Sequence, residues 1–155
     1  MSAAVVVRRG DRSDRAFIGD LGRRSAATSI SAVRTARYDD VLTAFDRLVD
    51  FVFDREHAAL IAEENGEPVG FLLLLFDIPD EVTLTEQAFV AYTAVEPHAR
   101  GRGIGAALLD EAEGLARAVG RRYLTLMVTE ENAPARALYD GAGFVTERRM
   151  LTKPL

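Results

Sequence analysis

The chain has 155 residues, 48% of them hydrophobic, which is enough for one domain with a substantial core and too apolar for a disordered segment. Its net charge of −5 excludes a chain-wide positive field for nucleic acid. The absence of cysteine excludes disulfides, thiolate metal sites and a cysteine nucleophile, and two distant histidines predict no metal site. With no leader-like N-terminus and no apolar run long enough to span a bilayer, we expect a soluble cytoplasmic protein with one domain over residues 1–155.

The first third of the chain predicts a strand followed by two helices. The β-branched run Val5–Val7 indicates the strand, and Asp11 or Ser13 is expected to cap a helix that continues to about Arg24. Residues 26–37 favour neither a helix nor a strand. A second helix is expected from about Asp39, because apolar residues recur there at helical spacing: Val41, Leu42, Phe45, Leu48, Val49 and Val52.

A hairpin and a doubly covered strand follow. Asn65–Gly66 lies between the apolar runs Ala58–Ala62 and Val69–Phe76, a pattern typical of two strands joined by a tight turn. Six consecutive apolar residues, Phe71–Phe76, predict a strand that is buried on both faces. We therefore expect helices on both sides of the sheet.

The second half alternates strands and helices. We expect a strand over Val82–Val95, starting as late as Ala88, and a helix from the glycine loop to about Gly120. A strand over Arg121–Thr129 and a helix from Asn132 to Tyr139 come next, and a last strand is expected over Phe144–Lys153. This order predicts an α+β (or α/β) three-layer fold with a mixed sheet.

A basic, glycine-rich loop joins the strand that ends at Val95 to the next helix. Its glycines permit unusual backbone angles and close approach, and a helix N-terminus adds free N–H groups, which together suit a phosphate or pyrophosphate. The loop also matches a plain tight turn and a loose dinucleotide fingerprint, Gly101-x-Gly103-x-x-Ala106, with Glu130 as the ribose acid. The phosphate-loop motif of NTPases is absent, because no Gly-Lys-Ser/Thr follows.

Two segments in the same order resemble the GNAT N-acetyltransferase superfamily. Arg100-x-x-Gly103-x-Gly105 is similar to its acyl-CoA signature, and Asn132 to Phe144 is similar to its Asn-x-x-Ala-x-x-Leu-Tyr-x-x-x-Gly-Phe block. The resemblance extends over about Gly66–Phe144. It implies a GNAT acyl-CoA N-acyltransferase fold, whose central sheet is mixed and mostly antiparallel, and acetyl-CoA as the co-substrate, with no metal.

The resemblance also implies where acetyl-CoA binds. The pyrophosphate is expected on the loop, and main-chain groups of the preceding strand, from Tyr92 to Val95, are expected to hold the pantetheine and polarise the thioester carbonyl. The implied cofactor-binding residues are Thr93, Ala94, Val95, Arg100, Gly101, Arg102, Gly103, Ile104, Gly105, Ala106, Asn132 and Tyr139.

Tyr139 matches the family tyrosine that protonates the departing thiolate, although it could also be a simple core residue. For the general base we favour Glu86, with Tyr92 and an ordered water as the alternatives. Arg34 and Arg37 could recognise an anionic acceptor or lie in a solvated loop.

The expected activity is direct acetyl transfer, in a ternary complex, to a primary amine: a small amine, an amino acid, an antibiotic or a protein N-terminus. A homodimer is expected by analogy, without nucleic acid or membrane partners. The alternatives are a non-catalytic acyl-CoA sensor and a dinucleotide-binding protein.

Overall fold

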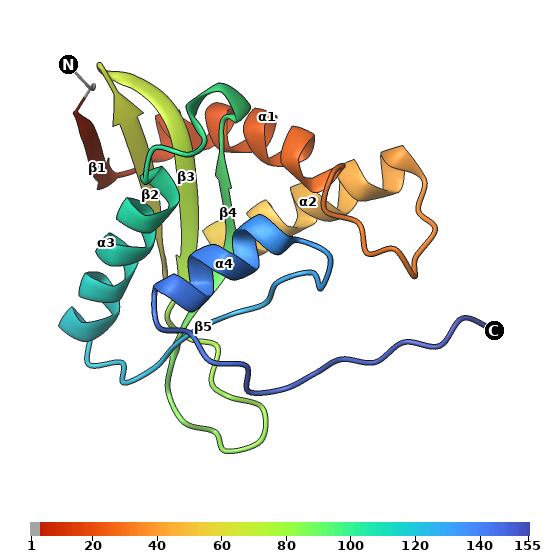
Figure 1. The fold of residues 1–155 in the computed structure, drawn as a ribbon. Coiled ribbons are helices and arrows are strands. Elements are labelled where there is room, and N and C mark those ends of the chain that lie inside the picture. Colours follow the sequence, from red (N-terminus) through yellow and green to blue (C-terminus); the bar gives the residue numbers. More distant parts are fainter. Residues whose placement is uncertain (1–3) are drawn as a thin grey trace.

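The computed structural model describes residues 4–155, which form a five-stranded sheet covered by helices on both faces (Figure 1). The strands lie in the order β1 (Val5–Arg9), β2 (His57–Glu64), β3 (Glu67–Leu75), β4 (Ala88–Val95) and β5 (Leu124–Leu126). The helices are α1 (Arg15–Ala26), α2 (Tyr38–Phe53), α3 (Ile104–Ala118) and α4 (Ala133–Gly141), with 3-10 turns at Arg12–Asp14 and Pro97–Ala99. β1 to β4 are antiparallel, and only β4 and β5 are parallel, so the predicted mixed, mostly antiparallel sheet is confirmed.

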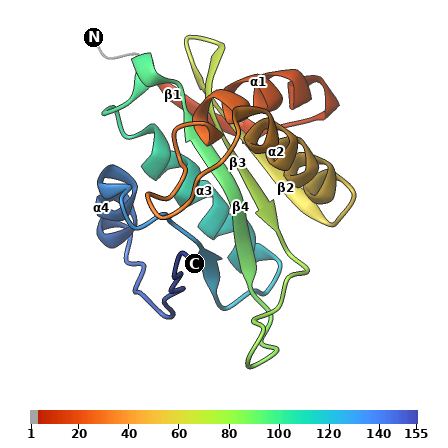
Figure 2. The ribbon, with the colours of Figure 1, turned by 90° about the vertical axis from the view of Figure 1, so that its right-hand side faces the viewer.

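The helices divide into two pairs across the sheet. One core lies between the sheet and α1 with α2, and includes Ile18, Phe45 and Val52. The other lies under α3, which contributes Ile104 and Leu108, and α4 packs at its margin. Figure 2 shows α1 and α2 on the opposite side of the sheet from α4.

β3 contributes side chains to both cores. Phe71, Leu73 and Leu75 face α1 and α2, whereas Leu72 and Leu74 face α3. All five are buried, because side chains alternate across a strand and this strand lies between two helix layers. The prediction from the uninterrupted apolar run is therefore confirmed.

Local signals in the first half are also confirmed. Asp11 accepts a hydrogen bond from the Ser13 N–H, and Asp14 accepts one from the Asp11 N–H, which completes a capping box before α1. Asn65 and Gly66 both have positive φ, 54° and 80°, as a two-residue hairpin turn of this hand requires. The single-domain expectation stays a prediction, and residues 1–3 lie outside the described residues.

Two predictions at the C-terminal end are wrong in extent or in kind. The strand expected over Arg121–Thr129 is paired only from Leu124 to Leu126. The last strand, expected over Phe144–Lys153, does not form, because no strand of the described chain pairs with these residues; the one backbone hydrogen bond given for them runs from the Phe144 N–H to the Tyr139 carbonyl, at the end of α4. Residue alternation can indicate the capacity to form a strand, but a strand also needs an edge to pair with.

α1 packs closely against α2 at Gly22. A Cβ built on this glycine would lie 1.9 Å from Cζ of Phe45, so Gly22→Ala must displace the ring of Phe45. We expect it to lower the free energy of unfolding by about 1–3 kcal/mol. Gly19→Ala, in the same helix with open space around it, should instead add about 0.5–1 kcal/mol. Urea unfolding of the two variants checks this, and equal midpoints would contradict the close approach.

Candidate active site

β5 pairs with only the first three residues of β4. The pairing joins Ala88–Val90 to Leu124–Leu126, where β5 ends. β4 continues to Val95, so within the described sheet its edge from Ala91 onward has no strand partner on this side. Unpaired N–H and C=O groups on such an edge can pair with an extended ligand.

A β-bulge lies at the point where the two strands part. β3 pairs Leu73 with Tyr92 but Leu74 with Val90, which leaves Ala91 as the extra residue of β4. A bulge bends its strand and increases the local twist. The bulge therefore bends β4 at the residue where its pairing with β5 ends.

The glycine loop presents free main-chain donors at the start of α3. Gly101 and Gly103 have φ values of 75° and 79°, in the left-handed region that favours glycine. The first hydrogen bond into the helix runs from the Ala107 N–H to the Gly103 carbonyl, at 3.0 Å. The N–H groups of Ile104, Gly105 and Ala106 are thus left without an intrahelical acceptor, at the positive end of the helix dipole. This arrangement fits a phosphate or a pyrophosphate.

Of the two loop arginines, Arg102 is paired with a carboxylate and Arg100 is not. Both carboxylate oxygens of Glu64, at the end of β2, accept hydrogen bonds from Nη1 of Arg102, at 2.7 and 2.8 Å. Arg100 donates only to the carbonyl of Val95, at 3.2 Å, and forms no ion pair among the described residues. The sequence predicted both as phosphate contacts, but Arg102 already has an anionic partner.

α4 brings two of the predicted site residues into position. The Asn132 side chain accepts a hydrogen bond from the Ala135 N–H at 3.3 Å, so its predicted capping role is confirmed. Tyr139 packs against the core under α3, with its ring centroid 5.8 Å from that of Phe144. Burial, with a smaller contribution from Tyr92, raises the pKa of the Tyr139 phenol. Because this pKa is raised above its ordinary value near 10, the phenol is protonated at neutral pH and can act as a proton donor.

The connection between α1 and α2, residues 27–37, reaches across towards α4 (Figure 2). The Thr129 hydroxyl donates to the Ser29 carbonyl, and the Glu131 carboxylate accepts from the Ala32 N–H, both at 3.2 Å. These bonds join the connection to the segment between β5 and α4. Arg34 and Arg37 are exposed, and neither forms an ion pair within the described part of the chain. The structure leaves both readings of these arginines open.

Glu96, which directly follows β4, is held by α1. Its carboxylate accepts hydrogen bonds from Arg24 at 2.7 and 3.0 Å, and this pairing lowers the pKa of the Glu96 carboxyl. The Tyr92 hydroxyl donates to Ser25 at 3.1 Å, near the same end of α1. Sequence reasoning missed Arg24, Ser25 and Glu96, because contacts over about 70 positions leave no local pattern.

Glu86, the expected general base, precedes β4 at the end remote from the glycine loop. Its side chain is 75% exposed and pairs with Arg121 at 3.2 Å. The segment of β4 that pairs with β5 lies between Glu86 and the open edge. The structure therefore does not bring Glu86 together with the other predicted residues.

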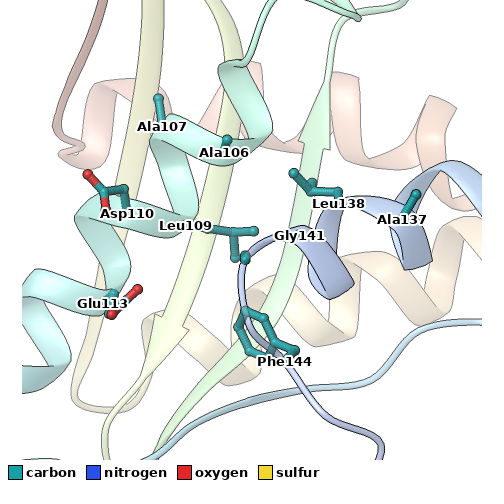
Figure 3. A pocket seen from close by; sticks show the side chains of 10 residues that line it. Ala106, Ala107, Leu109, Asp110, Glu113, Ala137, Leu138, Gly141 and Phe144 are labelled. Atoms are coloured by element: carbon teal, nitrogen blue, oxygen red, sulfur yellow. The ribbon is translucent and has the colours of Figure 1, made fainter.

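A groove of about 610 Å³ lies between α3 and α4. Figure 3 shows Leu109, Leu138 and Phe144 along it, with Asp110 and Glu113 on the α3 side. It begins at Ala106, in the first turn of α3, so it is continuous with the free N–H groups. A Cβ on Gly105 would lie 2.9 Å from Cδ2 of Leu138, so the Leu138 side chain packs directly against this glycine where α4 meets α3.

Residues 4–155 contain no cluster of histidine or acidic side chains suited to a metal ion. Within the same residues, no helix has both the length and the apolar character needed to cross a bilayer.

The different pairing of the two loop arginines gives a test. Arg100→Ala should weaken CoA binding roughly five- to tenfold, because it removes a charged donor to a phosphate. Arg102→Ala should have a smaller effect, since Glu64 already neutralises this side chain. Calorimetric titration of CoA into both variants checks the order. Equal losses would show that Arg102 leaves Glu64 when the ligand binds.

Comparison with known proteins agrees with this geometry. The chain is 37% identical over 91 residues to the uncharacterized N-acetyltransferase YhfO of Bacillus subtilis, and the match covers 59% of this chain and 60% of YhfO. Matches to the next two curated relatives cover 39% and 27% of their lengths, so the chain spans less than two thirds of the relatives it matches.

Solved structures share the fold over nearly the whole chain. A proposed acetyl transferase of Pyrococcus furiosus superposes with a TM-score of 0.84 at 25% identity, covering 98% of this chain and all of the other. The aminoglycoside N-acetyltransferase AAC(6')-Iy, solved with CoA, superposes with a TM-score of 0.69 at 16% identity, covering 97% and 98%. At that identity the second likeness shows the fold alone.

The sequence model of the acetyltransferase (GNAT) family matches residues 26–144, which include the bulged strand, the glycine loop and the helix that carries Tyr139. The chain belongs to the GNAT acetyltransferase family.

Proposed function

We propose that the protein is an acetyl-CoA-dependent N-acetyltransferase that transfers the acetyl group directly to a primary amine. The main support for this proposal is that three features lie together near the end of β4. They are the unpaired edge of β4, the N-terminus of α3 with its free N–H groups, and the protonated, half-buried phenol of Tyr139. Acetyl-CoA supplies the activated thioester. Side chains and main-chain groups of this chain bind acetyl-CoA and protonate the leaving thiolate, and water takes the proton from the amine.

The binding roles follow from the geometry. N–H groups of the loop and of the first turn of α3, over Gly101–Ala106, receive the pyrophosphate, and Arg100 adds a positive charge. Main-chain groups of Thr93, Ala94 and Val95 pair with the extended pantetheine, because this edge of β4 has no other partner in the described sheet. A β4 N–H beside the bulge polarises the thioester carbonyl. Asn132 fixes the start of α4 and hence the position of Tyr139.

The chemical step needs a proton acceptor and a proton donor. The amine nitrogen bonds to the acyl carbon as the carbon–sulfur bond breaks, the amine loses a proton, and the thiolate gains one from the Tyr139 hydroxyl. Glu96 is a weak acceptor because Arg24 lowers its pKa, and Glu86 lies away from the open edge. We therefore assign the proton from the amine to water beside the open edge of β4.

The protein's cytoplasmic location stays a prediction.

The acceptor is the least constrained part of the proposal. We place the entry of the amine beside the open edge of β4. This side is bordered by the connection 27–37 and by the segment from Thr129 to Glu131, which are joined by hydrogen bonds. Exposed Arg34 and Arg37 favour an acceptor that carries an anionic group in addition to its amine. The structural neighbour AAC(6')-Iy makes an aminoglycoside a second class to test.

Calorimetric titration of acetyl-CoA, followed by a free-thiol release assay over a panel of amines, tests the proposed function. The chain contains no cysteine, so the assay has no background from the protein. We expect micromolar binding and thiol release with one amine class. Binding without release on any amine would instead support the acyl-CoA sensor, and binding of NAD in place of CoA would support the dinucleotide alternative.

Tyr139→Phe tests the proton donor. It keeps the ring packed on Phe144 but removes the hydroxyl, so we expect CoA affinity to be nearly unchanged and kcat to fall by about 10²–10⁴. Because the pKa of this phenol is raised above its usual value near 10, wild-type turnover should persist to alkaline pH and fall only as pH passes the raised value. The variant should lose that alkaline limb.

Tyr123→Phe is the matched control, since Tyr123 is exposed and directly precedes β5, beside the start of β4 and away from its open edge. A kcat for Tyr139→Phe equal to that of this control would contradict the assignment.

A further inference from the structure

Tyr92 directly follows the bulge in β4, and its ring is held on the face of the sheet that α1 and α2 cover. The ring stacks on Phe71 with the centroids 6.0 Å apart, and it meets the ring of Phe45 edge-to-face at 5.0 Å. Phe45 in turn occupies the space beside Gly22, where a Cβ would collide with it. Aromatic neighbours from β3 and α2 thus fix the ring and give its phenol oxygen a defined position.

The proton of the Tyr92 hydroxyl points to α1. The hydroxyl donates to Oγ of Ser25, in the last turn of that helix, at 3.1 Å. A hydroxyl has one proton to donate but two lone pairs that accept. While the proton is given to Ser25, the Tyr92 oxygen can therefore serve a neighbouring donor only as an acceptor.

Tyr92 and Tyr139 reach the open edge of β4 from opposite faces of the sheet. Tyr92 packs with the core under α1 and α2, whereas Tyr139, on α4, packs with the core under α3. Figure 2 shows these helices on the two sides of β4. β5 ends opposite Val90, so in the described sheet no strand flanks β4 on this side at the level of Tyr92. The Tyr92 phenol is also close enough to contribute to the raised pKa of the Tyr139 phenol.

These two positions match two events of the proposed transfer. Tyr139 protonates the sulfur, and the amine nitrogen attacks the planar thioester from one side of its plane. After attack, the nitrogen of a primary amine carries two protons, of which one goes to water and one stays on the amide product. The N–H that stays needs an acceptor while water is displaced from around it. The free lone pairs of Tyr92 lie on the face opposite to Tyr139 and can supply this acceptor.

We propose that Tyr92 is a catalytic residue that holds the acceptor amine, its oxygen accepting the N–H that stays on the product. The contact aims the nitrogen at the thioester carbon from the face that α1 and α2 cover. Ser25 is a positioning residue, because it takes the Tyr92 proton and leaves the oxygen as an acceptor. The inference rests on the proposed acetyl transfer and keeps its proton balance: one amine proton goes to water, and Tyr139 gives one to the sulfur.

The contact also determines which amines react well. A secondary nitrogen carries only one proton after attack, and this proton cannot be lost to water and remain bonded to Tyr92. Loss of the Tyr92 oxygen should therefore narrow the preference for primary over secondary amines. A residue that only packs in the core would leave this preference unchanged.

Steady-state thiol release over the panel of amines, each paired with its N-methyl derivative (alanine with N-methylalanine, for example), tests the assignment. Tyr92→Phe keeps the ring between Phe45 and Phe71 but removes the oxygen. We expect kcat/KM for the primary amine to fall about tenfold and its ratio to that of the N-methyl amine about fivefold, as for one lost hydrogen bond. CoA affinity, measured by titration, should stay unchanged. Tyr123→Phe, the matched control, should alter none of these quantities.

Variants of Ser25 separate an oriented phenol from a merely packed one. Ser25→Ala should lower kcat/KM for the primary amine about three- to fivefold, and Ser25→Thr, which keeps a hydroxyl, should restore most of it. Because Ser25 acts through Tyr92, the double variant Ser25→Ala with Tyr92→Phe should lose no more than Tyr92→Phe alone. Independent effects on the fold would instead add.

The outcomes distinguish this inference from the proposed function. A wild-type protein that binds no CoA, or releases no thiol with any amine, contradicts the proposed function and the inference together. With an active wild type, a Tyr92→Phe variant that matches Tyr123→Phe in kcat/KM and in amine preference overturns the role of Tyr92 alone. Additive losses in the double variant would overturn the role of Ser25.

Discussion

The separation of β4 from β5 is the constraint on which the rest of the site depends. Main-chain N–H and C=O groups must be paired or solvated, so a strand that loses its neighbour needs another partner. This condition holds over the last part of β4, from the bulge at Ala91 onward, immediately before the chain turns into the glycine loop. The helix N-terminus and the open edge are consecutive in the chain, which places an anion site beside a site for an extended ligand.

The anion site relies more on the backbone than on side chains. The chain is acidic overall, and of the two loop arginines one is neutralised by Glu64. The free N–H groups of the first turn of α3 are independent of pH and of side-chain pairing, because the helix itself orients them. The arginine pairs around the site have a structural role: Arg24 joins α1 to the end of β4, and Arg102 joins the loop to the end of β2.

The shortness of β5 affects two parts of the molecule. On the side of β4, it leaves the β4 edge from Ala91 onward unpaired. On its outer side, β5 has an edge that no other strand of the described sheet covers. The segment that follows it carries Thr129 and Glu131, which hold the connection between α1 and α2.

Much of this protein was readable from the sequence alone. Helix periodicity, the capping residue Asp11, the Asn65–Gly66 turn and the two-sided burial of Phe71–Phe76 are local patterns, and local patterns suffice to predict them. The glycine loop and Asn132 were recognisable for the same reason, since each motif lies within a few consecutive residues.

Only the tertiary structure decided which charges are free and which strands are paired. Arg102 with Glu64, Arg24 with Glu96, and Arg148 with Asp80 join residues 38, 72 and 68 positions apart, and no local rule predicts such pairs. The same reason explains why Glu86 was expected as the general base, although it lies away from the open edge of β4, and why residues 144–153 were expected to form a strand. Strand propensity depends on the residues of the segment itself, whereas strand pairing also needs a free strand edge next to it in the folded protein.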